Sequence, residues 1–329
     1  MKELLLEVKS LTTELYINDT PQKVVDELTF NLYKGKTLGL VGESGCGKSM
    51  AALSLMRLLP DPPALPSRGE VMYRGKNLLT ISEDELRRIR GAKMAMIFQD
   101  PTTALNPVYT IGEQLMEVAL YHLDVSQDEA YEKALKALLE VGIPSPERRL
   151  NDFPHQLSGG MQQRVMIAMA LICEPDILIA DEPTTALDVT IQAQVLELIK
   201  QLQQKNGMAV LMITHDMGVI AEVADDVIVM YAGKGIERGT VLDIFDHASH
   251  PYTQALFRAR PVLSHAKESL VAIPGTVPPL GNYPGGCHFH PRCPYAMPMC
   301  KKGEVPFFKA EGTEEHTANC WLLRKDTPL

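Results

Sequence analysis

The sequence of 329 residues has no long hydrophobic run and no low-complexity tract. Its longest apolar segments, residues 165–173 and 227–232, fall far short of the roughly 18 residues that indicate a membrane span. The first residues, M-K-E-L-L-L-E-V-K, interrupt a short apolar run with acidic side chains, unlike a secretory signal. We therefore expect a cytosolic chain, which can still dock on a membrane protein.

Basic residues are too few and too scattered to predict a nucleic-acid-binding face. The chain has 32 Lys and Arg against 41 Asp and Glu, a net charge of -9, and no basic cluster longer than a pair. This balance argues against a DNA or RNA partner. The length allows one large domain with an appendage, or two domains.

Residues 42–49 read G-E-S-G-C-G-K-S, directly after the apolar run Thr37–Val41 and before the helix-like segment 50–59. This is the phosphate-binding pattern G-x-x-x-x-G-K-[ST] in its strand–loop–helix context. The glycines let backbone N–H groups surround a polyphosphate, Lys48 supplies positive charge to the β and γ phosphates, and Ser49 offers a hydroxyl to Mg²⁺. The predicted nucleotide-binding loop consists of Gly42, Glu43, Ser44, Gly45, Cys46, Gly47, Lys48 and Ser49.

Polar residues stand where three predicted strands end. Gln99 follows the apolar run 94–98, Asp181 and Glu182 end the run 177–182, and His215 follows the run 209–214. Ligands of open α/β sheets bind at the carboxyl ends of strands. Gln99 can ligate Mg²⁺ and position the attacking water, Asp181 suits Mg²⁺, Glu182 suits the general base, and His215 can bond a γ-phosphate. Each is weak evidence alone, and the phosphate loop upstream strengthens them together.

The remaining segments show strand and helix periodicities. Residues 4–30 alternate as in an antiparallel sheet, where Tyr16 either stacks on an adenine ring or is an ordinary hairpin aromatic. Residues 111–141 have helical periodicity. They lead to the segment Leu157–Arg164, whose Ser-Gly-Gly at a helix start is a second phosphate-binding device. A helix over 190–204 and a hairpin around Gly233 are also expected.

In this order and spacing the chain resembles the ATP-binding subunits of ATP-binding-cassette (ABC) transporters over residues 1 to about 260. The resemblance is carried by the phosphate loop, Gln99, the signature 157–164, the segment 177–182, Asp188 and His215. It implies an α/β fold of the ABC-type P-loop NTPase class, with a mixed or parallel core sheet. It also implies an N-terminal antiparallel β subdomain and a helical signature subdomain over about 105–172.

Within that group the chain is similar to the oligopeptide and dipeptide importer subunits. This closer resemblance lies in residues 98–107, 181–188 and 250–256. It implies an ATPase that energises the import of dipeptides or oligopeptides across the cytoplasmic membrane. Nickel-importer subunits are similar and stay open. Alternatives from other classes are a soluble ABC ATPase acting on nucleic acid or the ribosome, and a metal-binding regulator that only senses ATP.

The resemblance also implies partners. ATP and Mg²⁺ held by one subunit would be capped by the Ser158, Gly159, Gly160 and Gln162 element of a second, with Asp188 also at the nucleotide. The second ATPase would be a non-identical paralogue or another copy of this chain. Two membrane-spanning permease subunits and an extracytoplasmic solute-binding protein would complete the importer, with this chain peripheral at the cytoplasmic face of the membrane.

Beyond residue 260 the sequence becomes rich in Pro and Gly, which predicts a boundary between an ATP-binding domain, 1–260, and a C-terminal extension, 261–329. The extension holds Cys287, Cys293, Cys300 and Cys320 in the pattern C-x5-C-x6-C-x19-C. In a cytosolic chain these thiols can bind an iron-sulfur cluster or zinc, or remain free. No C-x2-C pair is present, which disfavours zinc, and the resemblance to peptide importers favours a [4Fe-4S] cluster. A structural role and a redox-sensing role both stay open.

Overall fold

The computed structural model describes residues 3–185, 188–259 and 273–324. The chain forms two compact units. The first unit comprises Met1–Leu5, Leu32–Lys36 and Thr80–Met212, and the second comprises Leu6–Asn31, Thr37–Leu79 and Ile213–Leu329. No helix in the described ranges combines the length and the hydropathy that a membrane crossing requires.

The first unit contains parallel strands that are buried along their whole length. β6 (Met94–Ile97) pairs in parallel with β7 (Ile177–Asp181), with Met94 opposite Ile177. β8 (Ala209–Thr214), which belongs to this unit through Met212, follows next to β7 in the sheet. Nearly continuous apolar strands of this kind are typical of parallel sheets covered on both faces. Because the strands are parallel, Gln99 and Glu182 emerge at the same edge.

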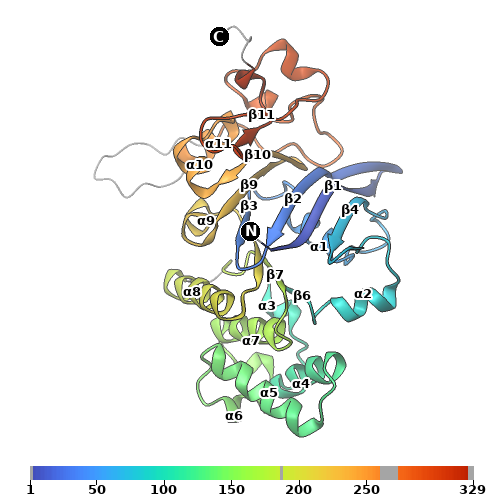
Figure 1. Ribbon diagram of the computed structural model, residues 1–329, viewed down its shortest axis with the longest axis vertical. Helices are drawn as coiled ribbons and strands as arrows, with labels where there is room; N and C mark the ends of the chain where they lie inside the picture. The colour runs from blue at the N-terminus through green and yellow to red at the C-terminus, as the bar shows by residue number, and fades with distance from the viewer. Residues whose placement is uncertain (1–2, 186–187, 260–272, 325–329) are drawn as a thin grey trace, which may run out of the picture. The chain divides into compact units, whose positions relative to one another are not determined.

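The helices of the first unit begin at well-formed caps. Thr110 and Ser126 each form a capping box with the Glu three residues later, so the region 111–141 is divided into two helices. α4 and α5 pack on each other and on α7 (Figure 1). The helices are α2 (Glu83–Ile89), α3 (Pro101–Ala104), α4 (Ile111–His122), α5 (Gln127–Glu140), α6 (Pro146–Arg149), η1 (Pro154–Gln156), α7 (Gly159–Leu171) and α8 (Val189–Asn206).

The second unit contains two groups of strands. A four-stranded sheet has the order β2-β1-β4-β5, and its long hairpin turns at Asn18 and Asp19, both of which have positive φ. The other group runs in the order β11-β12-β10-β9-β3, in which only the β3–β9 pair is parallel. The strands are β1 (Leu4–Ile17), β2 (Thr20–Tyr33), β3 (Thr37–Val41), β4 (Arg68–Tyr73), β5 (Lys76–Asn77), β9 (Asp226–Tyr231), β10 (Lys234–Thr240), β11 (Phe308–Lys309) and β12 (Thr317–Ala318).

The helices of the second unit are short. α1 starts at Lys48, two residues before the predicted segment, and ends early because Arg57 takes a positive φ. The helices are α1 (Lys48–Leu55), α9 (Met217–Val223), α10 (Val241–Asp246), α11 (Pro251–Arg258), η2 (His290–Arg292), η3 (Pro298–Lys301) and η4 (Trp321–Leu323).

The C-terminal residues are joined to the rest of the second unit through a sheet. β12 pairs with β10, with Glu237 opposite Ala318 and Arg238 opposite Thr317. The predicted boundary at residue 260 adjoins 260–272, which lie outside the described residues. The extension therefore adds two strands to the sheet that contains the phosphate-loop strand β3.

Candidate functional site

The phosphate loop connects β3 to α1 within the second unit. A Cβ on Gly47 would lie 2.5 Å from the Val24 carbonyl oxygen, and Gly47 has a φ of 103°. Gly45 is needed for its φ of 81° alone, because the space beside it is open. Gly47 is therefore required both by the close approach of another backbone segment and by its left-handed conformation. At Gly45 a side chain would have room, and only the left-handed conformation favours glycine.

The Lys48 side chain folds back over its own loop. It is only 5% exposed, and its Nζ donates to the carbonyl oxygens of Gly42 at 2.8 Å and Glu43 at 3.1 Å. Ser49 follows it in the first turn of α1, the helix end whose dipole favours an anion. This arrangement puts a buried cation and a hydroxyl at the start of α1.

The first unit brings Gln99 and Glu182 together. The Gln99 Nε2 donates to Glu182 Oε2 at 3.1 Å, and Thr185 Oγ1 donates to the same oxygen at 2.8 Å. Asp181, the last residue of β7, is buried beside them in the chain. Glu182 has a positive φ of 47°, which turns the backbone sharply at the strand end. Thr185 was not recognised in the sequence.

The signature segment forms the start of α7. Ser158 is the N-cap and its Oγ accepts a hydrogen bond from the Met161 N–H. The Gln162 amide is buried, and its Nε2 donates to the Pro154 carbonyl at 2.8 Å. Gln163, another residue that sequence reasoning missed, donates from Nε2 to the Pro183 carbonyl at 2.7 Å. The signature helix is therefore tied to the residue that follows Glu182.

Three further candidates occupy exposed positions. Asp188 caps α8, since its Oδ1 accepts from the Ile191 N–H at 2.9 Å. His215 lies exposed after β8, and Tyr16, 51% exposed, lies near the end of β1. Residues 186–187, between Thr185 and Asp188, lie outside the described residues.

Comparison with known proteins places the chain in a family. A model described as ABC transporter matches residues 25–185, and one described as the C-terminal region of oligopeptide/dipeptide transporters matches residues 236–300. A probable peptide ABC transporter ATP-binding protein of Sinorhizobium fredii is 50% identical over 320 residues, covering 97% of this chain and 95% of the relative. The chain belongs to the oligopeptide/dipeptide group of ABC transporter ATP-binding subunits. An oligopeptide transport ATP-binding protein of Bacillus subtilis is likewise 50% identical to this ABC subunit, over 98% of this chain and 90% of its own length.

Solved structures confirm the predicted fold of this ABC subunit. An ATP-binding cassette solved as a dimer, in a post-hydrolysis state with ADP and Pi, matches with a TM-score of 0.64 and 28% identity. The match covers 72% of this chain and 98% of that one. The chain is thus an α/β ABC ATPase, and ATP with Mg²⁺ is the nucleotide substrate that this family implies.

The four C-terminal cysteines of the ABC subunit surround one small cavity. Cys287, Cys293, Cys300 and Cys320 line it together with His250, and the Cys287 Sγ lies 4.0 Å from the His250 Nε2. All four are free thiols. Burial raises the pKa of Cys287 to about 11 and that of Cys320 to about 12, and the neighbouring cysteines contribute. Among the described residues, no three His, Cys, Asp or Glu side chains are placed to hold a single metal ion.

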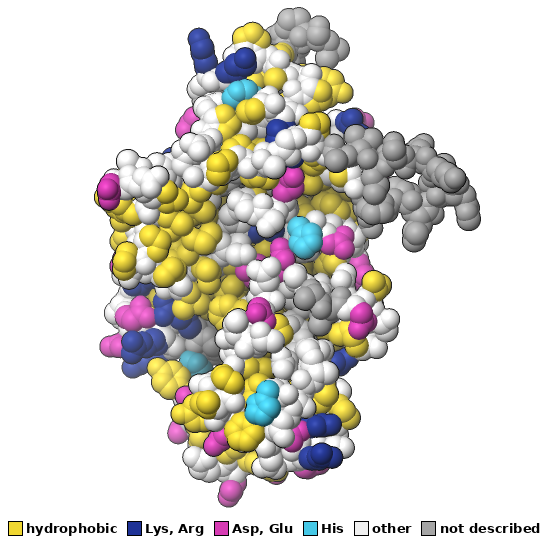
Figure 2. Space-filling view, turned by 180° about the vertical axis from the view of Figure 1, so that it is seen from behind, with side chains coloured by type: hydrophobic (Ala, Val, Ile, Leu, Met, Phe, Trp, Pro, Cys, Tyr) yellow, Lys and Arg dark blue, Asp and Glu magenta, His cyan; other side chains and the backbone are white. Residues whose placement is uncertain are grey.

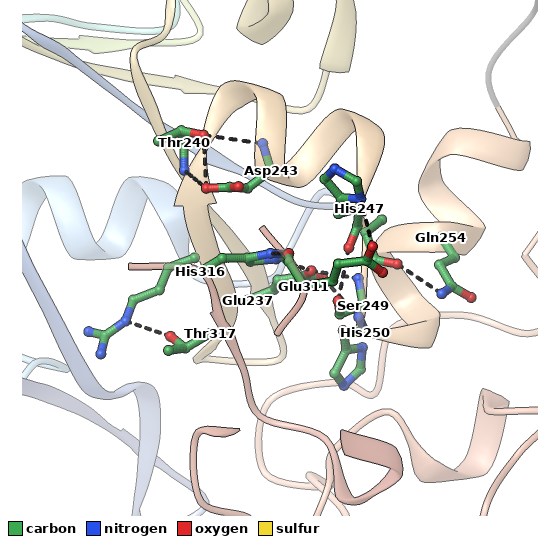
Figure 3. Close-up of polar contacts among 12 residues, drawn as sticks. Glu237, Thr240, Asp243, His247, Ser249, His250, Gln254, Glu311, His316 and Thr317 are labelled. Carbon is green, nitrogen blue, oxygen red and sulfur yellow. Dashed lines mark hydrogen bonds and ion pairs between the residues drawn. The ribbon is translucent and has the colours of Figure 1, made fainter. Parts of the chain in front are cut away.

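A second buried group joins the extension to β10. Glu237 and His316 are both fully buried, and the His316 Nε2 lies 2.9 Å from Glu237 Oε1 (Figure 3). The backbone N–H groups of Ser249 and His250 donate to the same carboxylate at 2.7 and 3.0 Å. The His316 Nδ1 contacts the Glu311 carbonyl. The structure thus brings together a buried histidine and a buried carboxylate that lie 79 positions apart in the chain.

Proposed function

We propose that this chain energises the import of dipeptides or oligopeptides across the cytoplasmic membrane, as a peripheral subunit at its cytoplasmic face. The observation that supports this proposal is the extent of the similarity. It does not stop at the ATPase but continues through residues 236–300, the region described for oligopeptide/dipeptide transporters. A nickel or other small-solute importer is the alternative that the experiment below separates.

In the proposed reaction the phosphate loop, residues 42–49, holds the β and γ phosphates of MgATP. Lys48 provides charge, while Ser49, Gln99 and Asp181 supply oxygen ligands of the type that Mg²⁺ prefers. Glu182 accepts the proton of the attacking water, and His215 bonds the γ-phosphate. Tyr16 stacks on the adenine ring.

The second phosphate-binding device acts on the nucleotide of a partner subunit. Ser158, Gly159 and Gly160 present backbone N–H groups at the start of α7, and a Cβ on Gly159 would meet no atom within 4 Å. The buried Gln162 side chain holds the loop that precedes α7. Asp188 faces the same nucleotide of the partner subunit. ATP binding then closes a pair of ATPase subunits and hydrolysis reopens it.

The partners are a second ABC ATPase, two permease subunits and an extracytoplasmic solute-binding protein. We propose a non-identical ATPase partner. No nucleic-acid partner is proposed, because the net charge is -9 and the Lys and Arg side chains on the face in Figure 2 form small separate groups.

The transport proposal is tested by purifying the tagged chain from membranes in detergent and identifying the subunits that copurify. The complex is then reconstituted in vesicles with its binding protein, and uptake of labelled dipeptides, oligopeptides and ⁶³Ni²⁺ is measured. ATP-dependent peptide uptake that disappears with Glu182→Gln is the expected result. Nickel uptake without peptide uptake would replace the proposed substrate, and purification without membrane subunits would contradict the transport role.

For the extension we propose a [4Fe-4S] cluster bound by Cys287, Cys293, Cys300 and Cys320. The four thiols line one cavity and influence one another's pKa, which fits four ligands of one group. The sequence has no C-x2-C pair, which disfavours zinc, and the resemblance to peptide importers favours a [4Fe-4S] cluster, which takes four thiolates. Such a group would stabilise a short segment that has little core of its own.

Iron, acid-labile sulfide and zinc are measured on protein purified without oxygen. Four iron and four sulfide per chain, lost in Cys300→Ser, are expected. Cys173→Ser is the matched control, because that buried thiol lies just after the C-terminal end of α7, in the first unit. Zinc at one per chain would indicate a zinc site, and neither metal would indicate free thiols.

A further inference from the structure

We infer that Arg292 of the C-terminal extension is a positioning residue of the phosphate loop, which it holds through Glu43. The pair is bidentate, with Arg292 Nη1 2.8 Å from Glu43 Oε2 and Nη2 3.1 Å from Oε1. These residues are 249 positions apart, and both belong to the second unit. The inference rests on ATP binding by the ABC family and does not depend on peptide as substrate or on a metal cluster.

The Arg292 side chain is buried and is held by several contacts. It is only 5% exposed, and its Nε donates to the Pro274 carbonyl at 2.8 Å. The guanidinium carbon lies 5.7 Å from the Tyr231 ring centre and 5.9 Å from that of Phe289. A planar, bidentate and stacked guanidinium has one preferred orientation, which an ammonium group cannot reproduce.

Glu43 is held by contacts within the loop and by contacts from outside it, and the Cys46 N–H donates to its carbonyl from within the loop at 3.4 Å. Its carboxylate meets Arg292, its N–H donates to the Tyr252 hydroxyl at 2.9 Å, and its carbonyl accepts from Lys48 at 3.1 Å. Tyr252 is itself fully buried against Tyr231. Lys48 and Arg292 therefore both contact Glu43: Lys48 bonds the Glu43 backbone carbonyl, and Arg292 bonds the Glu43 side chain.

The charge of the pair has a direct consequence for a phosphate ligand. Glu43 is the second residue of a loop that binds a polyanion, and its carboxylate would repel phosphate if it were not neutralised. Arg292 neutralises it and draws it toward the extension. The extension thereby contributes to nucleotide affinity without needing to touch the nucleotide.

The test is a double-mutant cycle on the full-length chain, with the dissociation constant of a fluorescent MgATP analogue as the readout. Arg292→Gln should weaken binding about tenfold when Glu43 is present, because it releases the carboxylate. In the Glu43→Gln background the same change should weaken binding less than about twofold. Arg292→Lys keeps the positive charge but loses the bidentate geometry. Its dissociation constant should lie between those of the unsubstituted chain and Arg292→Gln.

The matched control is Lys309→Ala, which removes the exposed ion pair to Glu314 in the same extension and should leave the dissociation constant unchanged. Thermal unfolding is recorded for every variant. If Arg292→Gln does not fold, the Glu43→Gln and Arg292→Lys variants still test the pair. Unchanged affinity in folded Arg292→Gln, or an equal loss in both Glu43 backgrounds, would overturn the inference. Loss of peptide uptake alone would concern the transport proposal.

Discussion

The Gln99 side-chain amide donates a hydrogen bond to Oε2 of Glu182, with 3.1 Å between the two atoms. Thr185 Oγ1 donates to the same oxygen at 2.8 Å. Two donors on one carboxylate oxygen restrict the rotation of the group that we propose as the general base. Gln99 follows β6 and Thr185 follows β7, and these two strands are parallel neighbours. The pairing of the strands therefore sets the distance between the two donors.

Glu182→Gln should leave ATP binding intact and lower turnover by roughly 10² or more, because the amide cannot accept the proton of water. ATP hydrolysis by the assembled transporter and nucleotide binding by the full chain are both measured. Glu174→Gln is the control, since that exposed carboxylate precedes the other end of β7. Near-normal turnover in Glu182→Gln would mean that another residue is the base.

Lys48→Ala should weaken nucleotide binding itself by at least about tenfold, since it removes the buried cation that we propose to bind the phosphates. The same change removes the bonds to the Gly42 and Glu43 carbonyls and should loosen the loop. Equilibrium titration with MgATP measures the first effect. Lys76→Ala, at an exposed lysine of β5, provides the comparison. Equal affinities in the two variants would refute the role given to Lys48.

Asp243 should make the free energy of unfolding depend on pH in the acidic range. Burial acts to raise its pKa, but hydrogen bonds from Thr313 and Thr240 lower the pKa to about 2. The ionised carboxylate therefore stabilises the fold above about pH 4, and this contribution, about 2 kcal/mol, declines as the pH falls toward 2. Urea unfolding of Asp243→Asn should show this deficit at pH 7 and a smaller one at pH 3.

The control for this prediction is Asp246→Asn, at the exposed last residue of the same helix α10. It should unfold with a free energy close to that of the unsubstituted chain. A deficit in Asp243→Asn that does not change with pH would show that the loss reflects altered packing and not ionisation.

The buried pair of Glu237 and His316 should have the opposite pH dependence. Burial acts to lower the pKa of His316, but the hydrogen bonds to Glu237 and to the Glu311 carbonyl, together with the negative charges of Glu237 and Asp243, outweigh burial and raise the pKa. The contribution is complete below about pH 6.5 and is lost as the pH rises through the raised pKa. Glu237→Gln should lower the free energy of unfolding by about 3 kcal/mol at pH 6.

Glu237→Gln combined with His316→Gln distinguishes loss of an ion pair from loss of space filling. The double variant should recover part of the stability, because neither charge is then left alone in the interior. If each single variant and the double variant all unfold alike between pH 6 and 8, the histidine is not charged in the folded protein.

Local patterns in the sequence were sufficient for the strands and for the groups at their ends. Uninterrupted apolar runs gave β3 and β8 their observed bounds, and the phosphate-loop motif located Lys48. The division between α4 and α5 could also have been found, because Ser126 and Glu129 form a capping-box signature. These features depend on residues within a few positions of one another.

The contacts that escaped prediction join residues far apart in the chain. Arg292 meets Glu43 and His316 meets Glu237 only because short irregular segments of the extension fold back onto the phosphate loop and β10. Such segments have no periodicity from which a partner could be inferred. One arginine beside a cysteine, or one histidine among turns, carries no local sign of its distant acceptor.

The pairing of β12 with β10 has a consequence for attempts to trim the protein. β10 is bonded to β9 on one side and to the extension on the other. A polypeptide cut after residue 259 would expose the backbone amides and carbonyls on the outer side of β10, and the buried Glu237 carboxylate would lose its His316 partner. An exposed strand edge of this kind can pair with the edge of another molecule and cause aggregation. A shortened ATPase would therefore need another segment to cover β10.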